Sequence, residues 1–150
     1  MTRKERPRRS DYRYFQAVTT RWKDNDAFGH VNNVEYYSYF DTAVTFFLIE
    51  HGLIGATDRD IITVVVETGC RFHSSVAFPD RVTVGVRVAR IGTTSVRYEI
   101  AVFRNDEDKA AADGHFVHVY VDRGSMRPVP VPEASRVALG TIATQQLARL

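Results

Sequence analysis

Residues 22–47 read WKDNDAFGHVNNVEYYSYFDTAVTFF and join two unlike halves. The first half gathers polar, turn-forming residues, whereas the second half is a long aromatic segment. Side chains of one face recur there at steps of three or four residues, which predicts a helix: Val34, Tyr37, Phe40, Val44, Phe47, Leu48 and His51. We expect this helix to run from about Asn33 to His51. Asn32 or Asn33 is its expected N-cap, and Gly52 is its expected stop.

A loop that carries carboxylates therefore leads directly into the start of a helix. Asp24 and Asp26 lie in this loop beside Gly29 and His30. The first turn of a helix offers backbone N–H groups without intrahelical partners and the positive end of the helix dipole, which together favour an oxyanion. A carboxylate next to such donors is a candidate for acyl-transfer chemistry.

The composition is that of one soluble globular domain. The 150 residues are 44% hydrophobic and 25% charged, and this length suffices for a single core. No apolar run is long enough to cross a membrane, and no apolar segment follows the basic N-terminus as a secretory signal requires. We therefore expect a cytoplasmic protein without a membrane partner. Cys70 is the only cysteine, which excludes an internal disulfide and fits a reducing compartment.

Positive charge is concentrated at the N-terminus. Residues 1–13 hold six basic residues against two acidic ones, while the whole chain carries a formal net charge of +2. Such a segment is typical either of a nucleic-acid-binding arm or of a solvated terminus, and we favour the solvated terminus. We therefore expect residues 1–11 to be a disordered basic tail and residues 12–150 to form one domain, with no nucleic-acid partner.

After the helix, the pattern changes to strands. Residues 61–66 are β-branched and apolar on both sides, which is typical of a central strand, and this strand is expected to continue through Cys70 and Phe72. Three further strands follow, separated by turns: residues 81–90, 95–104 and 110–121. The first of these alternates cleanly, with its even-numbered valines pointing inward.

The order of elements predicts the fold class. A strand at residues 12–22 precedes the helix, and residues 133–150 have the composition of a second, short C-terminal helix. One long helix followed by antiparallel hairpins favours an α+β domain, in which a curved antiparallel sheet wraps around one long central helix.

The element order and the loop together resemble the hotdog-fold acyl-CoA thioesterases, in particular the 4-hydroxybenzoyl-CoA thioesterase-like family. The family motif, Asp-x-Asp-x-x-Gly-His-Val-Asn-Asn, stands at residues 24–33 as DNDAFGHVNN and is followed by an aromatic helix. The resemblance covers residues 12–137 and implies a hotdog fold and an acyl-CoA substrate. It also implies assembly into homodimers or tetramers with sites at the interface. We expect no metal, and no cofactor besides the CoA that belongs to the substrate.

The resemblance assigns roles to the residues that match the motif. Asp26 matches the catalytic carboxylate, and Asn33 matches the helix-start position whose backbone N–H polarises the thioester carbonyl. His30 is the third catalytic candidate; it can position a water, orient Asp26 or contact substrate, or simply hydrogen-bond to the backbone. Six further residues are expected to contact substrate: Gly29, Asn32, Tyr36, Arg90, Thr93 and Thr94. The hydroxybenzoyl-specific enzymes carry a basic cluster where this chain has residues 91–95, so CoA phosphates bound there would meet hydroxyls, backbone N–H groups and Arg90.

Asp26 can act in two ways, and the sequence leaves both open. It can attack the thioester carbonyl to form a mixed anhydride, or it can deprotonate a water. Two alternative functions stay open as well. One is a thioesterase for acyl carrier protein, whose acidic helix requires a basic patch, and the other is a module that binds acyl-CoA without turnover.

Other residues with potential chemistry are given structural roles. We expect Asp24 to cap or turn the loop, and only one of the tyrosines at positions 36, 37 and 39 to face substrate. Cys70 and His73 have a C-x-x-H spacing, but the sequence offers no further zinc ligands at a suitable spacing. Cys70 is therefore expected to pack within its strand.

Overall fold

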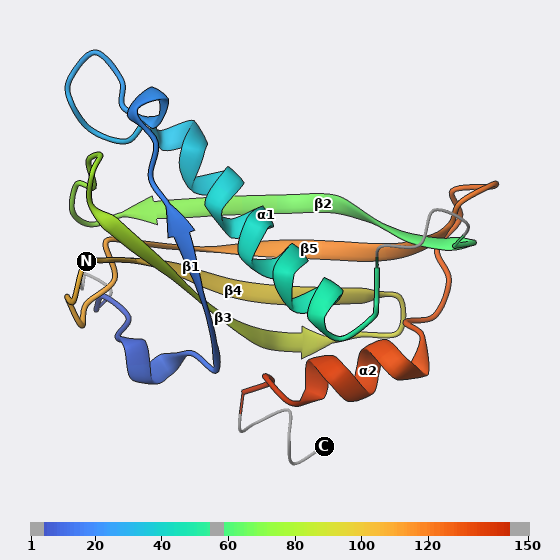
Figure 1. Cartoon of the computed structure of the whole chain (residues 1–150). Helices are drawn as coiled ribbons and strands as arrows, with labels where there is room; N and C mark the ends of the chain where they lie inside the picture. The colour runs from blue at the N-terminus through green and yellow to red at the C-terminus, as the bar shows by residue number, and fades with distance from the viewer. Residues whose placement is uncertain (1–4, 55–58, 145–150) are drawn as a thin grey trace.

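One five-stranded sheet and a long helix lying across it make up most of the computed structural model, which describes residues 5–54 and 59–144 (Figure 1). The elements follow in the order η1 (Arg9–Asp11), β1 (Tyr14–Thr19), η2 (Trp22–Asp24), α1 (Asn33–Glu50), β2 (Ile61–Phe72), β3 (Arg81–Ile91), β4 (Ser95–Arg104), β5 (Ala112–Asp122) and α2 (Glu133–Gly140). The first strand is shorter than predicted, because the chain turns into η2 at Trp22. The part of the predicted C-terminal helix at residues 145–150 lies outside the described residues.

All strand pairs are antiparallel, and the strands stand in the order β1-β3-β4-β5-β2. The three central strands, β3, β4 and β5, form a meander, while β1 and β2 lie at the two edges, so β2 pairs with β5 and not with the next strand along the chain. Figure 1 shows the sheet curving around α1, with α2 beside one end of the sheet. This arrangement confirms the predicted α+β hotdog fold. In the described ranges, no helix is long and apolar enough to cross a membrane.

Helix α1 begins at Asn33 as predicted, because Oδ1 of Asn32 accepts the backbone N–H of Val34 at 3.2 Å and thereby caps the first turn. Its buried face differs from the prediction at the N-terminal end. Val34 is 63% exposed, whereas Tyr36 and Tyr39 are buried. The aromatic and apolar residues of this helix lie on nearly all of its sides. Spacing alone therefore predicts the wrong buried face for the first two turns.

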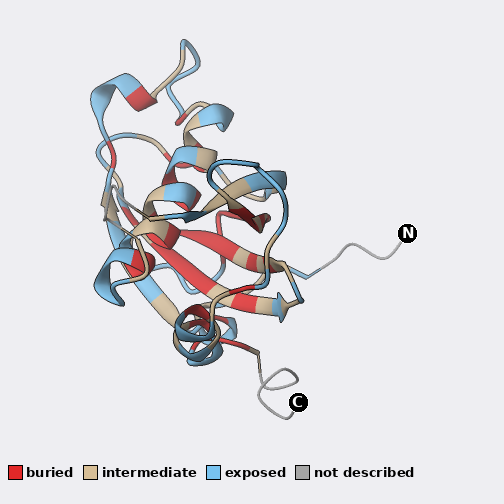
Figure 2. Cartoon of the chain, turned by 90° about the vertical axis from the view of Figure 1, so that its right-hand side faces the viewer, coloured by how far each residue is buried: buried red, intermediate tan, exposed pale blue. Residues whose placement is uncertain are grey.

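The core fills the space between α1 and the inner face of the sheet. Alternate residues of the central strands point into it, as the sequence predicts: Val82, Val84, Val86, Val88, Val96, Tyr98, Ile100 and Val102. Figure 2 shows these buried stretches in red along the strands that α1 covers. Gly114 allows the close approach of the layers, since an added Cβ would collide with the carbonyl oxygen of Gly69 and lie 2.7 Å from Cε2 of Phe40.

The predicted central position of β2 is wrong, because β2 is an edge strand. It pairs with β5 along its length, and no second strand flanks it in the described residues. Val65 and Val66, at the bulge in the middle of β2, are 51% and 57% exposed. A strand that is apolar on both sides normally lies inside a sheet. The single chain does not supply the neighbour that this composition calls for.

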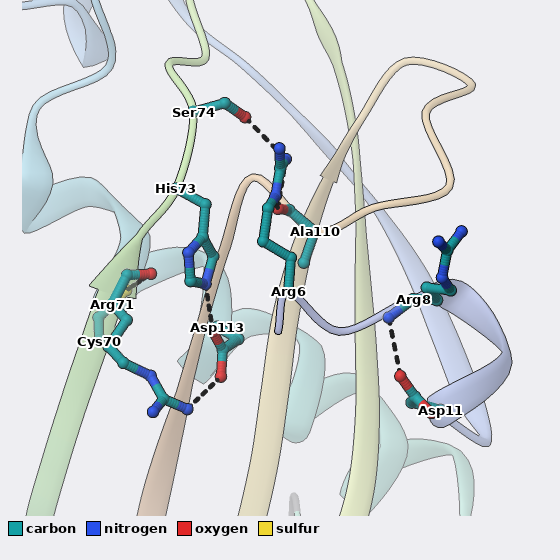
Figure 3. Close-up of polar contacts among 9 residues, drawn as sticks. All are labelled: Arg6, Arg8, Asp11, Cys70, Arg71, His73, Ser74, Ala110 and Asp113. Carbon is teal, nitrogen blue, oxygen red and sulfur yellow. Dashed lines mark hydrogen bonds and ion pairs between the residues drawn. The ribbon is translucent and has the colours of Figure 1, made fainter. Parts of the chain in front are cut away.

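The predicted disorder of residues 1–11 is wrong for residues 6–11, which pair with the hairpin between β4 and β5. The backbone N–H of Ala110 donates to the carbonyl of Pro7 at 2.8 Å. The guanidinium of Arg6 donates to the carbonyl of Ala110 at 2.7 and 3.0 Å and to the hydroxyl of Ser74 at 3.2 Å (Figure 3). Composition predicts that an arginine-rich segment stays solvated, but here guanidinium groups satisfy backbone carbonyls of the domain. Residues 1–4 lie outside the described part.

The N-terminal segment, residues 6–11, lies beside a second, smaller core on the outer face of the sheet. Tyr12 is buried there against Phe103, with ring centroids 5.8 Å apart in an edge-to-face arrangement. The guanidinium of Arg9 lies over the Phe103 ring, 4.9 Å from its centroid. The outer face is thus partly covered by the chain's own N-terminal segment.

Candidate active site

The loop that carries Asp26 is closed by its own backbone. The N–H of Asp26 donates to the carbonyl of His30 at 2.8 Å, and the N–H of Gly29 donates to the carbonyl of Asp26 at 3.1 Å. Gly29 has a φ of 81°, a left-handed conformation that glycine adopts without strain. Asn25 and Val31 form an isolated antiparallel bridge across the base of the loop. These bonds make a tight turn with Asp26 at its start.

The Asp26 carboxylate is half-buried and is held at one oxygen. Its Oδ1 accepts the backbone N–H of Phe28 at 2.8 Å, which fixes the rotation of the side chain. Its Oδ2 accepts no hydrogen bond from the residues that the structure describes. A carboxylate with one fixed and one open oxygen is suited to attack a carbonyl or to accept a proton.

The helix start follows the loop directly. Asn32 caps α1, and Asn33 is its first residue. The backbone N–H of such a residue has no intrahelical partner and lies at the positive end of the helix dipole. A negative charge that develops on a carbonyl oxygen near Asn33 would therefore be stabilised.

A cleft of about 280 Å³ opens at this helix start. Its walls come from the loop, from the first turn of α1 and from the connection between β2 and β3: His30, Val31, Asn33, Tyr36, Phe72, His73, Ser74 and Ser75. Tyr36 packs edge-to-face on Phe72, with ring centroids 5.0 Å apart. The structure thus brings His30, Asn33 and Tyr36 together. Asp26 lies in the same loop but is not among the residues that line the cleft.

The two walls of the cleft are tied to each other. The N–H of Val31 donates to the carbonyl of Val76 at 2.7 Å, and the N–H of Phe78 donates to Oδ1 of Asn25 at 3.0 Å. These two hydrogen bonds hold the Asp26 loop against the β2–β3 connection. Such rigidity is what a preorganised catalytic site requires.

Cys70 and His73 do not act as a pair. Burial raises the pKa of Cys70 to about 12, so its thiol stays protonated at neutral pH and is a poor nucleophile. The Nε2 of His73 lies 2.6 Å from Oδ1 of Asp113, whose other oxygen accepts from Arg71 at 2.8 Å (Figure 3). In the described part of the chain, no three residues of the types that bind metals come together as a metal site.

Arg90, Thr93 and Thr94 lie at the opposite end of the sheet from the cleft. Phe72, at the cleft, pairs with Ala112, whereas these three residues surround the turn between β3 and β4 at the other end (Figure 1). The carbonyls of Thr93 and Thr94 accept the backbone N–H groups of Val131 and Tyr120. Within one chain they are not part of the cleft, and their contact with substrate stays a prediction.

Sequence reasoning missed one wall of the cleft. Phe72, Ser74 and Ser75 stand about forty residues after the motif, and no local pattern indicates that they return to it. The one usable signal is the end of an apolar strand at Phe72 followed by polar turn residues. Asn25, inside the motif, is predicted from its type only to form a turn, although its side chain binds the backbone of Phe78.

Comparison with known proteins identifies the family of the chain. The sequence profile of the thioesterase-like superfamily matches residues 20–139. The crystal structure of the PA5185 protein from Pseudomonas aeruginosa strain PAO1 is 48% identical, with a TM-score of 0.90, and the match covers 94% of this chain and 99% of that one. The BH1999 gentisyl-coenzyme A thioesterase is 26% identical with a TM-score of 0.75, covering 84% and 99%. A thioesterase from Thermus thermophilus, complexed with coenzyme A and Zn, is 29% identical with a TM-score of 0.71, covering 88% and 95%.

Proposed function

The chain belongs to the thioesterase-like superfamily and is a thioester hydrolase, and we propose that its substrate is an acyl-CoA bound at the cleft beside the start of α1. One observation carries this proposal. The carboxylate of Asp26 has one oxygen without a donor, and the backbone N–H of Asn33 has no acceptor, among the described residues, and both belong to the same loop and helix start. A nucleophile or base next to an oxyanion donor is the minimum equipment for hydrolysis of a thioester.

In the proposed reaction the carbonyl oxygen of the thioester accepts the N–H of Asn33. Asp26 either attacks the carbonyl carbon or removes a proton from a water that attacks it. In the first case the C–S bond breaks, CoA leaves as the thiolate, and water then cleaves the mixed anhydride to the acid and free Asp26. In the second case the hydroxide adds directly, and the departing thiolate takes up the proton. His30 and Asn32 support the loop, while Gly29 and Tyr36 border the bound ester.

Two observations favour CoA as the carrier of the acyl group. The related structures include a gentisyl-coenzyme A thioesterase and a thioesterase with bound coenzyme A. The cleft also combines apolar walls, Val31, Tyr36 and Phe72, with hydroxyl and imidazole groups. Sites for small molecules combine apolar walls with placed polar groups in this way.

We further propose that two copies of the chain pair through β2, and that the protein acts in the cytoplasm. A long edge strand with exposed valines presents unpaired backbone groups and apolar surface at the same place. A second β2 would satisfy both. Sedimentation equilibrium tests this assembly, and a monomer at micromolar concentration would contradict it.

The function is tested by thiol release from a panel of short, long and aromatic acyl-CoAs. Asp26→Asn keeps the size of the side chain but removes its charge, and we expect kcat to fall about 10³-fold or more, as for other catalytic carboxylates. Asp106→Asn is the matched control, because that carboxylate is 91% exposed at the β4–β5 hairpin. Unchanged turnover in Asp26→Asn would refute the site while leaving the family intact.

The same panel separates the alternative functions. Faster turnover of acyl groups carried by acyl carrier protein than of the same groups on CoA would assign the enzyme to carrier-bound substrates. Binding of acyl-CoA without thiol release by wild type would identify a binding module instead.

A further inference from the structure

Asp24 is a charged side chain buried completely inside the molecule, with an exposed fraction of 0%. Three donors reach its carboxylate. The hydroxyl of Tyr39 donates to Oδ2 at 2.8 Å, the backbone N–H of Arg21 donates to Oδ2 at 3.0 Å, and Nε–H of Arg21 donates to Oδ1 at 3.2 Å. A carboxylate is retained inside a protein only when its oxygens are satisfied in this way.

These bonds anchor both ends of the Asp26 loop on α1. Tyr39 belongs to the second turn of α1, so its bond to Asp24 ties the beginning of the loop to the helix. The backbone carbonyl of Asp24 accepts the N–H of Asn32, the N-cap, at 2.8 Å. Asp24 therefore holds both ends of the loop, and its side chain is hydrogen-bonded to α1. The first backbone N–H of this helix is the group that we assign to the substrate carbonyl.

Packing alone does not explain this arrangement. The Tyr39 ring is buried and lies against the Tyr36 ring at a centroid distance of 6.1 Å, and a phenylalanine would fill the same space. An apolar residue in place of Asp24 would avoid the desolvation of a charge. Burial and the neighbouring carboxylate raise the pKa of Tyr39 well above its usual range, so its hydroxyl remains a donor at physiological pH.

Asp24 itself does not reach the substrate. It is fully buried, and both of its carboxylate oxygens accept hydrogen bonds from protein groups. Its effect on the reaction must therefore act through the position of the loop.

We propose that Asp24 and Tyr39 are positioning residues, whose hydrogen bond holds Asp26 in register with the backbone N–H of Asn33. The kinetic consequence of this proposal rests on the proposed function. The geometric consequence, the fixed position of the loop, does not. An error of about 1 Å in the position of a reacting group can lower a rate about 10²-fold, so a single hydrogen bond at the loop base matters.

Two variants test the proposal, each with a matched control. Tyr39→Phe removes one donor and keeps the ring, and its control Tyr98→Phe removes a buried hydroxyl that has no hydrogen-bond partner in the described residues. Asp24→Asn leaves one acceptor oxygen for three donors. Its control Glu99→Gln changes a half-buried carboxylate that pairs with Arg87 at 3.3 Å on the outer face and does not line the cleft.

Two readouts are measured for each variant: kcat and KM on the best acyl-CoA, and hydrogen exchange of the Phe28 amide, which bonds to Asp26. We expect Tyr39→Phe to lower kcat about tenfold and Asp24→Asn about 10²-fold, with KM within about twofold. The double variant should be no slower than Asp24→Asn, because both substitutions act on the same hydrogen bond, the one between Tyr39 and Asp24. The Phe28 amide should exchange faster in both variants and at the wild-type rate in both controls.

The outcomes separate the proposal from a structural role and from the proposed function. If the controls lose as much kcat as the test variants, the effect is general destabilisation and the proposal is wrong. If Tyr39→Phe retains both the kcat and the Phe28 exchange rate of wild type, the bond between Asp24 and Tyr39 does not position the loop. If wild type releases no thiol from any ester, the proposed function fails, and the Phe28 exchange alone still decides whether Asp24 and Tyr39 hold the loop.

Discussion

His118 and His115 lie on the same strand, β5, and point to opposite faces of the sheet. On the inner face the His118 ring packs near Tyr98 and Phe116, with centroids 5.2 and 5.6 Å away. Neither of its nitrogens has a hydrogen-bond partner among the described residues. On the outer face Nε2 of His115 lies 2.9 Å from Oε2 of Glu67, in a pair that is partly exposed.

The surroundings of the two histidines are typical of the two faces of the sheet, which differ in how they are packed. The inner face is closely packed against α1, and the cleft opens at its end. The outer face is covered by long side chains in ion pairs, such as Arg87 with Glu99 at 3.3 Å and Arg97 with Glu67 at 3.5 Å. Partly exposed ion pairs contribute about 0–1 kcal/mol each and adapt when a neighbour changes. A close-packed core does not adapt, so substitutions on the helix side should have larger effects.

After Asp26→Asn, the largest effect on the helix side should follow from removal of one N–H group at the helix start. Proline is well tolerated at the first position of a helix and lacks the amide hydrogen. Asn32 already has the extended backbone, with φ −60° and ψ 139°, that suits a residue before proline. We expect Asn33→Pro to lower kcat about 10²–10³-fold, as loss of an oxyanion donor does, and to leave the melting temperature nearly unchanged.

Asn33→Ala is the control for this prediction, because it removes the side chain and keeps the N–H. Thiol release by the two variants, measured side by side, distinguishes the backbone from the side chain. Should Asn33→Pro turn over as fast as Asn33→Ala, the carbonyl oxygen is held by another donor.

A second, smaller effect compares the two faces through neighbouring glycines. An added Cβ at Gly114 would meet the backbone of Gly69 and the Phe40 ring on the helix side. An added Cβ at Gly69 would lie 2.9 Å from Cε1 of His115, at the free end of a side chain. We expect Gly114→Ala to lower the free energy of unfolding by about 3 kcal/mol, the upper range for an overpacked core.

Gly69→Ala should lower the free energy of unfolding by less than about 1 kcal/mol, because the His115 ring can turn aside at the expense of one partly exposed pair. Urea denaturation of both variants measures the difference. Equal losses would show that the outer face is as rigid as the inner one.

The periodic elements were predictable because their signals are local. The alternating valines of β3 and the Asn32 cap of α1 depend on neighbours in sequence, and both are where the sequence places them. The register of the first helical turns was not predictable from spacing, since Tyr36 and Tyr39 are drawn inward by partners outside the helix, Phe72 and Asp24. Tertiary contacts here override the local pattern.

The remaining errors concern contacts between distant parts of the chain. Residues 6–11 look solvated by composition, yet they bind carbonyls of the β4–β5 hairpin, about one hundred residues away. The apolar composition of β2 predicts neighbours on both sides, whereas the described residues of the single chain provide only one. In the candidate site, the motif identified the loop and the helix start, whereas the wall at Phe72 and Ser75 came only from the fold.

The smallest predicted effect is the pH dependence of stability, and it again separates the faces. Burial lowers the pKa of His118 below its ordinary value of 6.5, against a smaller opposing influence of Asp41 on α1. The unfolded chain therefore binds a proton at this residue at a higher pH than the folded chain does. The contribution of His118 to stability is constant above pH 6.5 and is lost as the pH falls through that value, with a slope of at most about 1.4 kcal/mol per pH unit.

His118→Phe removes this group and should flatten the dependence of the unfolding free energy on pH between about 6.5 and 5, as linkage requires. Tyr98→Phe is the matched control, because it also removes a buried polar atom without a partner in the described residues but does not titrate in this range. Urea denaturation at several pH values gives the slopes. If His118→Phe and wild type lose stability equally on acidification, the proton uptake occurs elsewhere, and the inner face tolerates a charge that its close packing should exclude. A difference confined to His118→Phe would place the acid-sensitive group on the helix side of the sheet, where burial penalises the charged imidazole and no hydrogen-bond acceptor among the described residues offsets that penalty.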